Sequence, residues 1–248
     1  MTRFTFLDCQ MDDLTMQETL NHIKKTIKCN LQIKHCVVNV AKLISMRNNN
    51  QLKNSVVNSD VINIDGIGLV LGARLLGYRV KERVTGIDLF EHLISYANDE
   101  KIPIYLLGAK KYTLEKVKKN LIIKHPNLNI VGSHHGYFNQ DEDQSIVKEI
   151  SLSGAKMLFV GMSSPKKEIF IDTWTDSLGV NLTMGVGGTF DIIAKETRRA
   201  PKYIQRIGLE WLFRLIQEPG RMWKRYLYTN SYYLLILFRE YIISKLFK

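Results

Sequence analysis

The sequence predicts an α/β fold, in which a Rossmann-like, mostly parallel β-sheet carries helices on both faces and is followed by a C-terminal helical appendage. Short apolar runs alternate along the chain with segments in which apolar residues recur every three or four positions, a pattern of strands separated by helices. The runs are mostly apolar and show no strict alternation with polar residues, as expected of strands that are buried on both faces. Ligands of such sheets bind outside the carboxyl ends of the strands.

Six strands and the helices between them follow from this pattern. The predicted strands are 36–40 (CVVNV), 61–64 (VINI), 102–108 (IPIYLLG), 129–132 (NIVG), 156–161 (KMLFVG) and 181–187 (NLTMGVG). Three- and four-residue spacing of apolar residues predicts helices over 41–54, 86–100, 113–125, 141–153 and 165–178.

Composition limits the kinds of partner. The net charge of +11 indicates an anionic partner, which is a nucleic acid, a phosphorylated substrate or an anionic membrane surface. Cys9, Cys29 and Cys36 show no C-x-x-C spacing, so neither a disulfide framework nor a zinc site is expected. Acidic residues interrupt the first 15 residues, where a signal peptide needs an apolar stretch, and we therefore expect a cytoplasmic protein.

The composition changes after residue 201, and we predict two units, 1–201 and 202–248. The second holds nine Lys/Arg against three Glu, and 11 of the 24 aromatic residues. Its longest apolar run, YYLLILF at 232–238, is far shorter than the ~20 residues that span a bilayer. Aromatic and basic residues together favour an element that associates with an anionic membrane surface; the alternative is a terminal helix pair packed on the core.

The segment VINIDGIGLVLGARLLG (61–77) places Asp65 between a strand and a glycine-rich turn. Its glycines spell G-x-G-x-x-x-G, one residue off the dinucleotide fingerprint, and no ribose-binding acid clearly follows, so a Rossmann oxidoreductase is weakly supported. A carboxylate here would repel a pyrophosphate at the helix N-terminus. We interpret Asp65 as a general base at a strand end. The alternative is a helix N-cap, a common role of aspartate.

Two later turns repeat the arrangement of strand, turn and helix. In GMSSPKKEIFI (161–171), Ser164 is the expected N-cap and Pro165 the first helical residue. Lys166 and Lys167 would then lie in the first turn and oppose the helix dipole, which indicates either an anionic ligand or a solvated lysine pair.

The third turn lies in GVGGTFDIIA (185–194). Gly187 and Gly188 bring backbone N–H groups near a phosphate or sugar, and Asp191 follows at a position suited to a ribose or a base edge.

No metal and no cofactor are predicted. The DED at 141–143 precedes a helical pattern and is interpreted as capping charge rather than as a metal-binding D-x-D motif. His134 and His135 are adjacent, so their side chains diverge, and we expect structural or substrate-contact roles for them. Tyr137 in HHGYF is a candidate pocket residue.

Several blocks taken in order resemble one bacterial glycosyltransferase family. DGIGLVLGARLLGYRVKERVTGIDLF, GMSSPKKE and the stretch from GVGGTFD to GRMWKRYL are similar to the teichoic-acid N-acetylmannosaminyltransferases, the enterobacterial common antigen mannosaminuronic acid transferases and related capsule and exopolysaccharide enzymes. The likeness runs from VVNVAKL to RYL, nearly the whole chain.

The resemblance implies a metal-independent, inverting transfer from a UDP-sugar to a saccharide on an undecaprenyl-diphosphate-type lipid. It implies a peripheral location on the inner face of the bacterial plasma membrane. Asp65 matches the family's proposed base. The predicted substrate-binding residues are Asn39, Arg83, Gly108, Tyr137, Lys167, Gly187, Gly188 and Asp191. The predicted residues for the lipid diphosphate or the membrane are Arg214, Arg221, Lys224 and Arg225.

The chain departs from the family pattern at two positions of the presumed donor pocket. Val37 stands where the family usually has threonine, and Lys167 where it usually has glutamine. The loss of a hydroxyl and the gain of a charge point to a different donor, with an acidic sugar such as a uronic acid as one candidate.

Other function classes stay open at this stage. A non-catalytic, membrane-associated nucleotide-sugar-binding protein would share the pocket without needing Asp65. Nucleic-acid binding has only charge and aromatic residues in its favour and lacks a recognisable module, so no nucleic acid is expected. A homo-oligomer is kept as an alternative.

Overall fold

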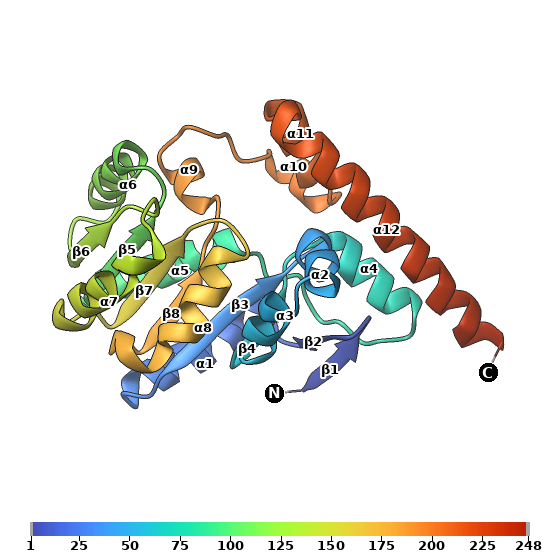
Figure 1. Ribbon diagram of the computed structural model, residues 1–248, viewed down its shortest axis with the longest axis horizontal. Helices are drawn as coiled ribbons and strands as arrows, with labels where there is room; N and C mark the ends of the chain where they lie inside the picture. Colours follow the sequence, from blue (N-terminus) through green and yellow to red (C-terminus); the bar gives the residue numbers. More distant parts are fainter. Residues whose placement is uncertain (1, 247–248) are drawn as a thin grey trace.

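The computed structural model describes residues 2–246, in which a parallel sheet of six strands forms the centre of the fold (Figure 1). The strand order is β4-β3-β8-β7-β5-β6, and every neighbouring pair is parallel. The strands are β3 (Ile33–Val38), β4 (Val61–Ile64), β5 (Ile104–Gly108), β6 (Ile130–His134), β7 (Met157–Gly161) and β8 (Leu182–Gly185). The predicted α/β class with a mostly parallel sheet is confirmed.

The agreement of the predicted strand bounds with the structure differs between strands. The strand predicted at 61–64 matches β4, whereas the one predicted at 36–40 begins too late and ends too late. Asn39 ends β3 because its side-chain oxygen accepts a hydrogen bond from the Lys42 N–H at 3.0 Å and so caps α2 (Val40–Arg47). Lys34 and His35 obscured the beginning of β3 because they are polar.

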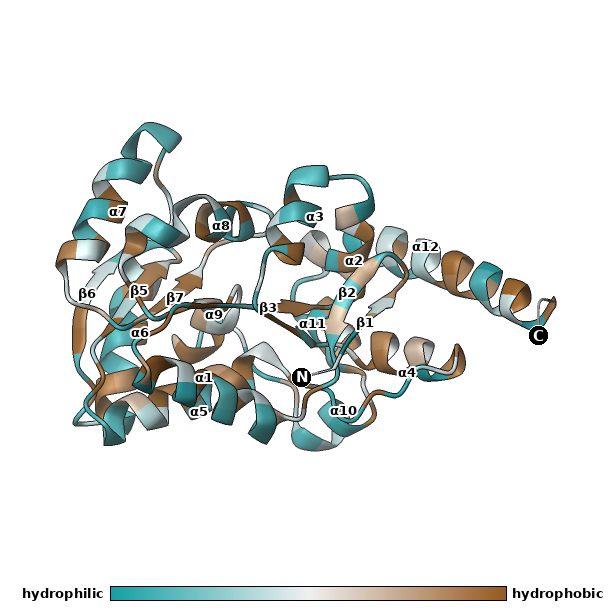
Figure 2. Ribbon diagram, turned by 90° about the horizontal axis from the view of Figure 1, so that it is seen from below, coloured by the Kyte–Doolittle hydropathy of each residue, from teal (hydrophilic) through white to brown (hydrophobic). Residues whose placement is uncertain are grey.

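Helices cover both faces of the sheet (Figure 2). The helices are α1 (Met16–Lys28), α2, α3 (Asn50–Val57), α4 (Ile67–Leu75), α5 (Gly86–Asp99), α6 (Lys111–Lys124), α7 (Asp143–Leu152), α8 (Lys166–Leu178), α9 (Thr189–Ile193), α10 (Lys202–Arg206), α11 (Glu210–Gln217), α12 (Pro219–Leu246) and the 3-10 helix η1 (Gln140–Glu142). One apolar cluster joins α1, α5, α6 and α9 to one face of the sheet. Two further clusters cover the other face, through α2 and α3 at one end and α7 and α8 at the other.

Two local features were not predicted. The single helix expected over 41–54 is two helices, because Asn49 caps α3 by accepting a hydrogen bond from the Leu52 N–H at 2.8 Å. An antiparallel hairpin of β1 (Arg3–Phe6) and β2 (Cys9–Asp12) precedes the sheet. Its Phe6 and Met11 are fully buried beside β4, so the hairpin extends the core.

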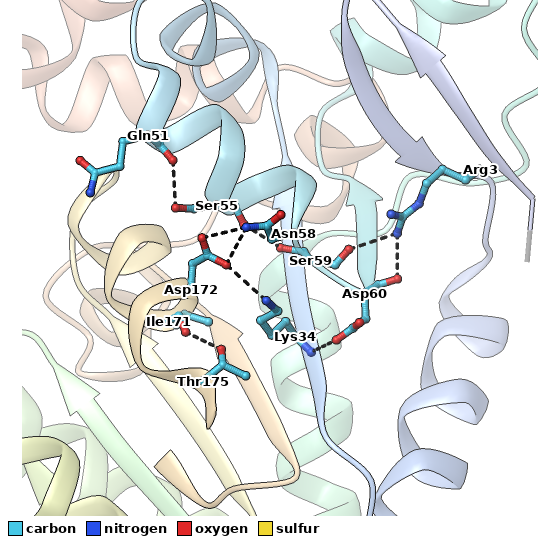
Figure 3. A network of polar contacts seen from close by, with 10 residues as sticks. All are labelled: Arg3, Lys34, Gln51, Ser55, Asn58, Ser59, Asp60, Ile171, Asp172 and Thr175. Carbon is cyan, nitrogen blue, oxygen red and sulfur yellow. Dashed lines mark hydrogen bonds and ion pairs between the residues drawn. The ribbon is translucent and has the colours of Figure 1, made fainter. Parts of the chain in front are cut away.

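A polar network ties α3 and α8 to the amino ends of β3 and β4 (Figure 3). Asp172 of α8 accepts a hydrogen bond from Asn58 at 3.1 Å and lies 3.2 Å from Lys34 Nζ. Asp60 accepts a hydrogen bond from the Lys34 N–H at 2.7 Å, while its carbonyl accepts one from Arg3 at 2.8 Å. These bonds stabilise the amino edge of the sheet, where the strands begin. They leave the carboxyl edge, where the strands end, free.

The C-terminal helix α12 packs against α2 and α4. Tyr233, Ile236 and Leu237 are buried in the same apolar cluster as the core residues of these helices. The Tyr233 hydroxyl donates a hydrogen bond to the Gly68 carbonyl at 2.8 Å. The alternative given for the appendage was a terminal helix pair packed on the core. The face of α12 that carries these three residues does pack on the core. The boundary between 1–201 and 202–248 stays a prediction.

The other face of α12 is apolar and exposed. Leu227, Leu234, Leu235 and Phe238 have exposed fractions of 63%, 62%, 67% and 64%. Within residues 2–246, none of the helices combines the length and the hydropathy that crossing a membrane requires.

The close approach of α12 to α4 makes Gly72 a sensitive position. A Cβ at Gly72 would lie 2.0 Å from the Tyr233 hydroxyl oxygen and 3.2 Å from the ring carbon that carries it. We predict that Gly72→Ala destabilises the protein by about 1–3 kcal/mol through overpacking. In a Tyr233→Phe background the same substitution should cost much less, because the clashing oxygen is gone. Urea unfolding of the four proteins of this double-mutant cycle measures the difference, and equal costs in both backgrounds would contradict the packing.

Candidate active site

A cleft of about 2020 Å³ opens along the carboxyl edge of the sheet, between the strand ends and helices α11 and α12. The predicted residues that line it are Asn39, Asp65, Arg83, Tyr137, Lys167, Gly187, Gly188, Asp191, Arg214, Lys224 and Arg225. The fold therefore brings together predicted residues that come from nearly the whole length of the chain. Their individual roles stay predictions.

Two predicted residues are not placed in the cleft. Gly108 does not line it, whereas its neighbour Ala109 does. The φ of Gly108 is +133°, and a Cβ there would lie 2.4 Å from the Gly161 carbonyl carbon, so glycine is needed for the close approach of the ends of β5 and β7. Arg221 belongs to α12, but its side chain falls outside the part of the chain that the structure describes.

Asp65 is fixed directly after β4. Its N–H donates a hydrogen bond to the Val38 carbonyl at 2.8 Å, which holds it against the end of β3. Its carboxylate Oδ2 accepts a hydrogen bond from the N–H of Gly86, the first residue of α5, at 3.2 Å. The N-cap of the following helix α4 is Gly66, which has no side-chain cap. The interpretation of Asp65 as the N-cap of α4 is therefore wrong, and its carboxylate lines the cleft.

The surroundings of Asp65 favour its protonated form. Burial raises the pKa of the Asp65 carboxyl to about 6, against the opposing effect of the Gly86 hydrogen bond. The charge of Glu210 raises this pKa further, whereas Arg83 and Lys42 lower it. A carboxylate with a pKa near 6 is well matched to accept a proton near neutral pH.

Arg83 is held by an acidic residue of the appendage. Its Nη1 lies 2.6 Å from Oε2 of Glu210, the first residue of α11. The pair joins the loop before α5 to the C-terminal helices and lies close enough to Asp65 for both charges to act on its pKa. Sequence reasoning found Arg83 but missed Glu210, for which no local pattern gave a signal.

The turn after β8 brings a cation against exposed backbone. Gly187 has a φ of +51° and open space where a Cβ would stand. A Cβ at Gly188 would lie 2.8 Å from Nη2 of Arg214, so the guanidinium of α11 rests on this glycine. Backbone N–H groups and a guanidinium at one turn suit an anionic group of a ligand.

A buried group of charges stands at the start of α8. This helix begins at Lys166, with Pro165 as its N-cap, one residue later than predicted for Ser164 and Pro165. Lys166 donates a hydrogen bond to the Phe138 carbonyl at 2.7 Å. Lys167 is buried, with its Nζ 2.7 Å from Glu168 Oε1. The interpretation of Lys166 and Lys167 as a solvated pair is therefore wrong for Lys167.

Lys42 completes the group, with its Nζ also 2.7 Å from Glu168 Oε1. Burial works against the charge of this carboxylate, yet the two ammonium groups hold the pKa of Glu168 at about 2. Sequence reasoning missed Lys42 and Glu168. The signal for Lys42 was its place in the apolar run of α2, between Ala41 and Leu43.

A further ion pair holds the segment that links the sheet to the appendage. Arg199 lines the cleft, and its Nη2 lies 2.7 Å from Oδ1 of Asp88 in the first turn of α5. Sequence reasoning missed this arginine as well, because its partner is far away along the chain.

The segments considered for metal binding have other contacts. Glu142 accepts a hydrogen bond from the Asn139 N–H at 2.8 Å in a capping box, so the capping interpretation of DED is confirmed for Glu142. A hydrogen bond of 2.8 Å joins His134 Nδ1 to the His135 carbonyl, and the two ring centroids lie 4.5 Å apart, so the expected divergence of the two side chains is wrong. Over residues 2–246, no cluster of three or more His, Cys, Asp and Glu side chains is suited to hold a metal ion.

The Asp65 carboxyl, with its raised pKa, and several cationic side chains thus line a wide cleft at the carboxyl edge of a parallel sheet. The chain belongs to the glycosyl transferase WecG/TagA/CpsF family, whose model matches residues 4–246. It is 37% identical over 183 residues to the N-acetylglucosaminyldiphosphoundecaprenol N-acetyl-beta-D-mannosaminyltransferase of Bacillus subtilis (strain 168), a match that covers 73% of this chain and 70% of that protein. The resemblance predicted from the sequence is confirmed, and the chain is a glycosyltransferase.

The raised pKa of Asp65 predicts a pH-dependent cost to folding. Between its ordinary pKa of 3.8 and about 6, the folded protein holds a proton that the unfolded chain has lost, so stability falls as the pH rises through this window. Asp65→Asn stays neutral and keeps an oxygen for the Gly86 N–H. We expect it to melt at a higher temperature than the unsubstituted protein at pH 7, with the difference shrinking towards pH 4.

Thermal unfolding followed by circular dichroism from pH 4 to pH 8 measures this difference. The matched control is Asp176→Asn on the exposed surface of α8, which should leave the pH dependence unchanged. A constant difference between Asp65→Asn and the unsubstituted protein at every pH would show that the Asp65 carboxyl titrates normally.

Proposed function

We propose that this protein is an inverting glycosyltransferase that moves a sugar, N-acetylmannosamine or mannosaminuronic acid or a related hexose, from a UDP-sugar to an undecaprenyl-diphosphate-linked saccharide during synthesis of a cell-surface polysaccharide. The observation that carries the proposal is the Asp65 carboxylate at the end of β4, facing the cleft with a pKa raised to about 6. The similarity to a transferase whose name specifies an N-acetylmannosaminyl group and an undecaprenol diphosphate supports this choice of substrates.

Asp65 acts as the general base. Its carboxylate takes the proton of the acceptor hydroxyl while that oxygen bonds to the anomeric carbon of the donor sugar. The bond between this carbon and the diphosphate oxygen breaks on the opposite face, so the configuration inverts and UDP leaves. Proton transfer by a positioned base contributes roughly 10²–10⁴-fold to the rate.

The charge on the departing UDP is met by residues of two elements. Arg214 and the backbone at Gly187 and Gly188 form the part of the cleft best suited to a diphosphate. Arg83 adds a second cation, which lines the cleft and is paired with Glu210. Asp191, which follows the glycine turn, is the candidate contact for the ribose or the base.

The lipid-linked acceptor enters from the appendage. Lys224 and Arg225 line the cleft on α12, the helix whose exposed face carries Leu234, Leu235 and Phe238. An apolar surface beside basic residues is typical of helices that lie in the boundary of an anionic bilayer. The protein is thereby peripheral on the inner face of the plasma membrane, with the lipid diphosphate delivered to the rim of the cleft.

The direct test is product formation. The purified protein is incubated with a panel of UDP-sugars and a polyprenyl-diphosphate-linked sugar, and the lipid product is weighed by mass spectrometry. An added hexose-type mass with one donor supports the proposal. Tight binding of UDP-sugars with no product from any donor and acceptor would favour the non-catalytic alternative.

Asp65→Asn tests the base. We predict a loss of turnover of about 10²–10⁴-fold, with UDP affinity unchanged, because the amide fills the same space but accepts no proton. Turnover is measured with the lipid acceptor, and UDP affinity by titration calorimetry. Asp176→Asn should keep full activity, and an equally active Asp65→Asn protein would remove Asp65 as the base.

The exposed face of α12 tests the membrane contact. We predict that Leu234→Gln with Leu235→Gln abolishes sedimentation with vesicles rich in anionic lipid, because the apolar contact is lost. Lys224→Gln with Arg225→Gln should weaken vesicle binding about 30-fold, at about 1 kcal/mol for each charge. The control is Leu152→Gln, an equally exposed leucine on α7. Sedimentation of all variants like the unsubstituted protein would contradict this surface.

A further inference from the structure

The charged group formed by Lys42, Lys167 and Glu168 is almost completely buried. The exposed fractions of these residues are 7%, 7% and 6%. Both ammonium groups lie 2.7 Å from the same carboxylate oxygen, Oε1 of Glu168. Three ionic side chains are therefore removed from water, and their charges do not cancel.

Two ammonium groups share one buried carboxylate, and burial together with the charge of Lys42 lowers the pKa of the Lys167 ammonium. The second contact of Lys42 Nζ is the sulfur of Cys36 at 3.3 Å, which is a weak partner for an ammonium group. Oε2 of Glu168 is buried and makes no hydrogen bond within the described residues. A buried charge that lacks a counter-ion is costly, and such groups are usually paired or hold a ligand.

The group reaches the cleft on the side of the proposed base. Lys42 and Lys167 both line the cleft. Lys42 follows Asn39 by one helical turn, and its charge acts on Asp65, so this ammonium stands on the side of the proposed base. The stem of Lys167 passes 3.1 Å from the place of a Cβ on Gly185, at the end of β8.

We propose that Lys42 and Lys167 form a subsite for a carboxylate on the transferred sugar, so that the donor of this enzyme is a UDP-linked hexuronic acid rather than a neutral hexosamine. The inference rests on the proposed function and specifies its donor. A carboxylate bound here raises the buried set to two negative and two positive charges. It also supplies acceptors for the ammonium hydrogens that Glu168 and Cys36 leave unused.

The diphosphate is the other anionic part of such a donor, but cations elsewhere suit it better. Arg214 lies against Gly188 on the glycine turn that lines the cleft, and Arg83 lines the cleft from the loop before α5. Lys42, in contrast, lies one turn after Asn39, and its charge acts on Asp65. A neutral sugar would leave the excess ammonium unpaired in a dry site, and this penalty would provide the discrimination.

The test compares two donors that differ only at C6. Titration calorimetry measures the affinity for UDP-N-acetylmannosaminuronic acid, for UDP-N-acetylmannosamine and for UDP alone. We expect the unsubstituted protein to bind the acidic donor at least tenfold more tightly than the neutral one. Lys167→Gln should abolish this preference with the affinity for UDP unchanged, and Lys119→Gln, on the exposed surface of α6, should keep it.

The melting temperatures of the variants serve as the control for correct folding. Lys167→Gln leaves Lys42 and Glu168 as a neutral pair, so its melting temperature should equal or exceed that of the unsubstituted protein. Lys42→Gln is the second variant and should lose the same preference, with Lys167 kept as the partner of Glu168.

Each remaining outcome has one meaning. Equal affinity of the unsubstituted protein for the two donors overturns the subsite. An equal loss of affinity for UDP and for both donors in Lys167→Gln also overturns it and assigns the lysine pair to the diphosphate. Preferential binding of the acidic donor without transfer to any lipid-linked acceptor supports the subsite and refutes the proposed function instead.

Discussion

The common direction of the six strands is the constraint on which the site depends. In a parallel sheet every strand ends at the same edge, so the segments after β3, β4, β7 and β8 meet although up to about 150 residues separate them. Asn39, Asp65, Lys167 and Gly188 each follow one of these strands directly or within a few residues. The amino edge carries the Asp60 and Asp172 network instead, which stabilises the sheet without occupying the cleft.

The cleft is not a uniformly basic surface, despite the net charge of +11. Arg83 and Arg199 each have a carboxylate partner, Glu210 and Asp88. The lysines next to Glu168 share one carboxylate between two ammonium groups. Attraction for an anionic group is thus concentrated where pairing is incomplete. The buried lysines and the raised pKa of Asp65 both cost folding free energy, as expected of groups kept for chemistry rather than for stability.

The sequence predicted what depends on local pattern and missed what depends on tertiary pairing. Mostly apolar runs located the strands, and the position of Asp65 at a strand end made it the candidate base. The partnership of Lys42 with Glu168, 126 positions apart, had no local signature. Glu210 belongs to a helix that packs back on the sheet, so its nearness to Arg83 followed only from the fold. Gly108 was predicted to bind substrate, whereas its glycine is needed for the close approach of β5 and β7, which no local pattern shows.

Because α11 and α12 line the cleft but come last in the chain, the parts of the cleft are synthesised in a fixed order. The segment 1–201 leaves the ribosome first and contains every strand, together with Asp65. Glu210 and Arg214 emerge only afterwards, and Tyr233, which anchors α12 on α4, emerges later still. A nascent chain therefore holds the Asp65 carboxylate before it holds the helices that line the cleft with it. The lining of the cleft is complete only near the end of synthesis, when the apolar face of α12 is also first available.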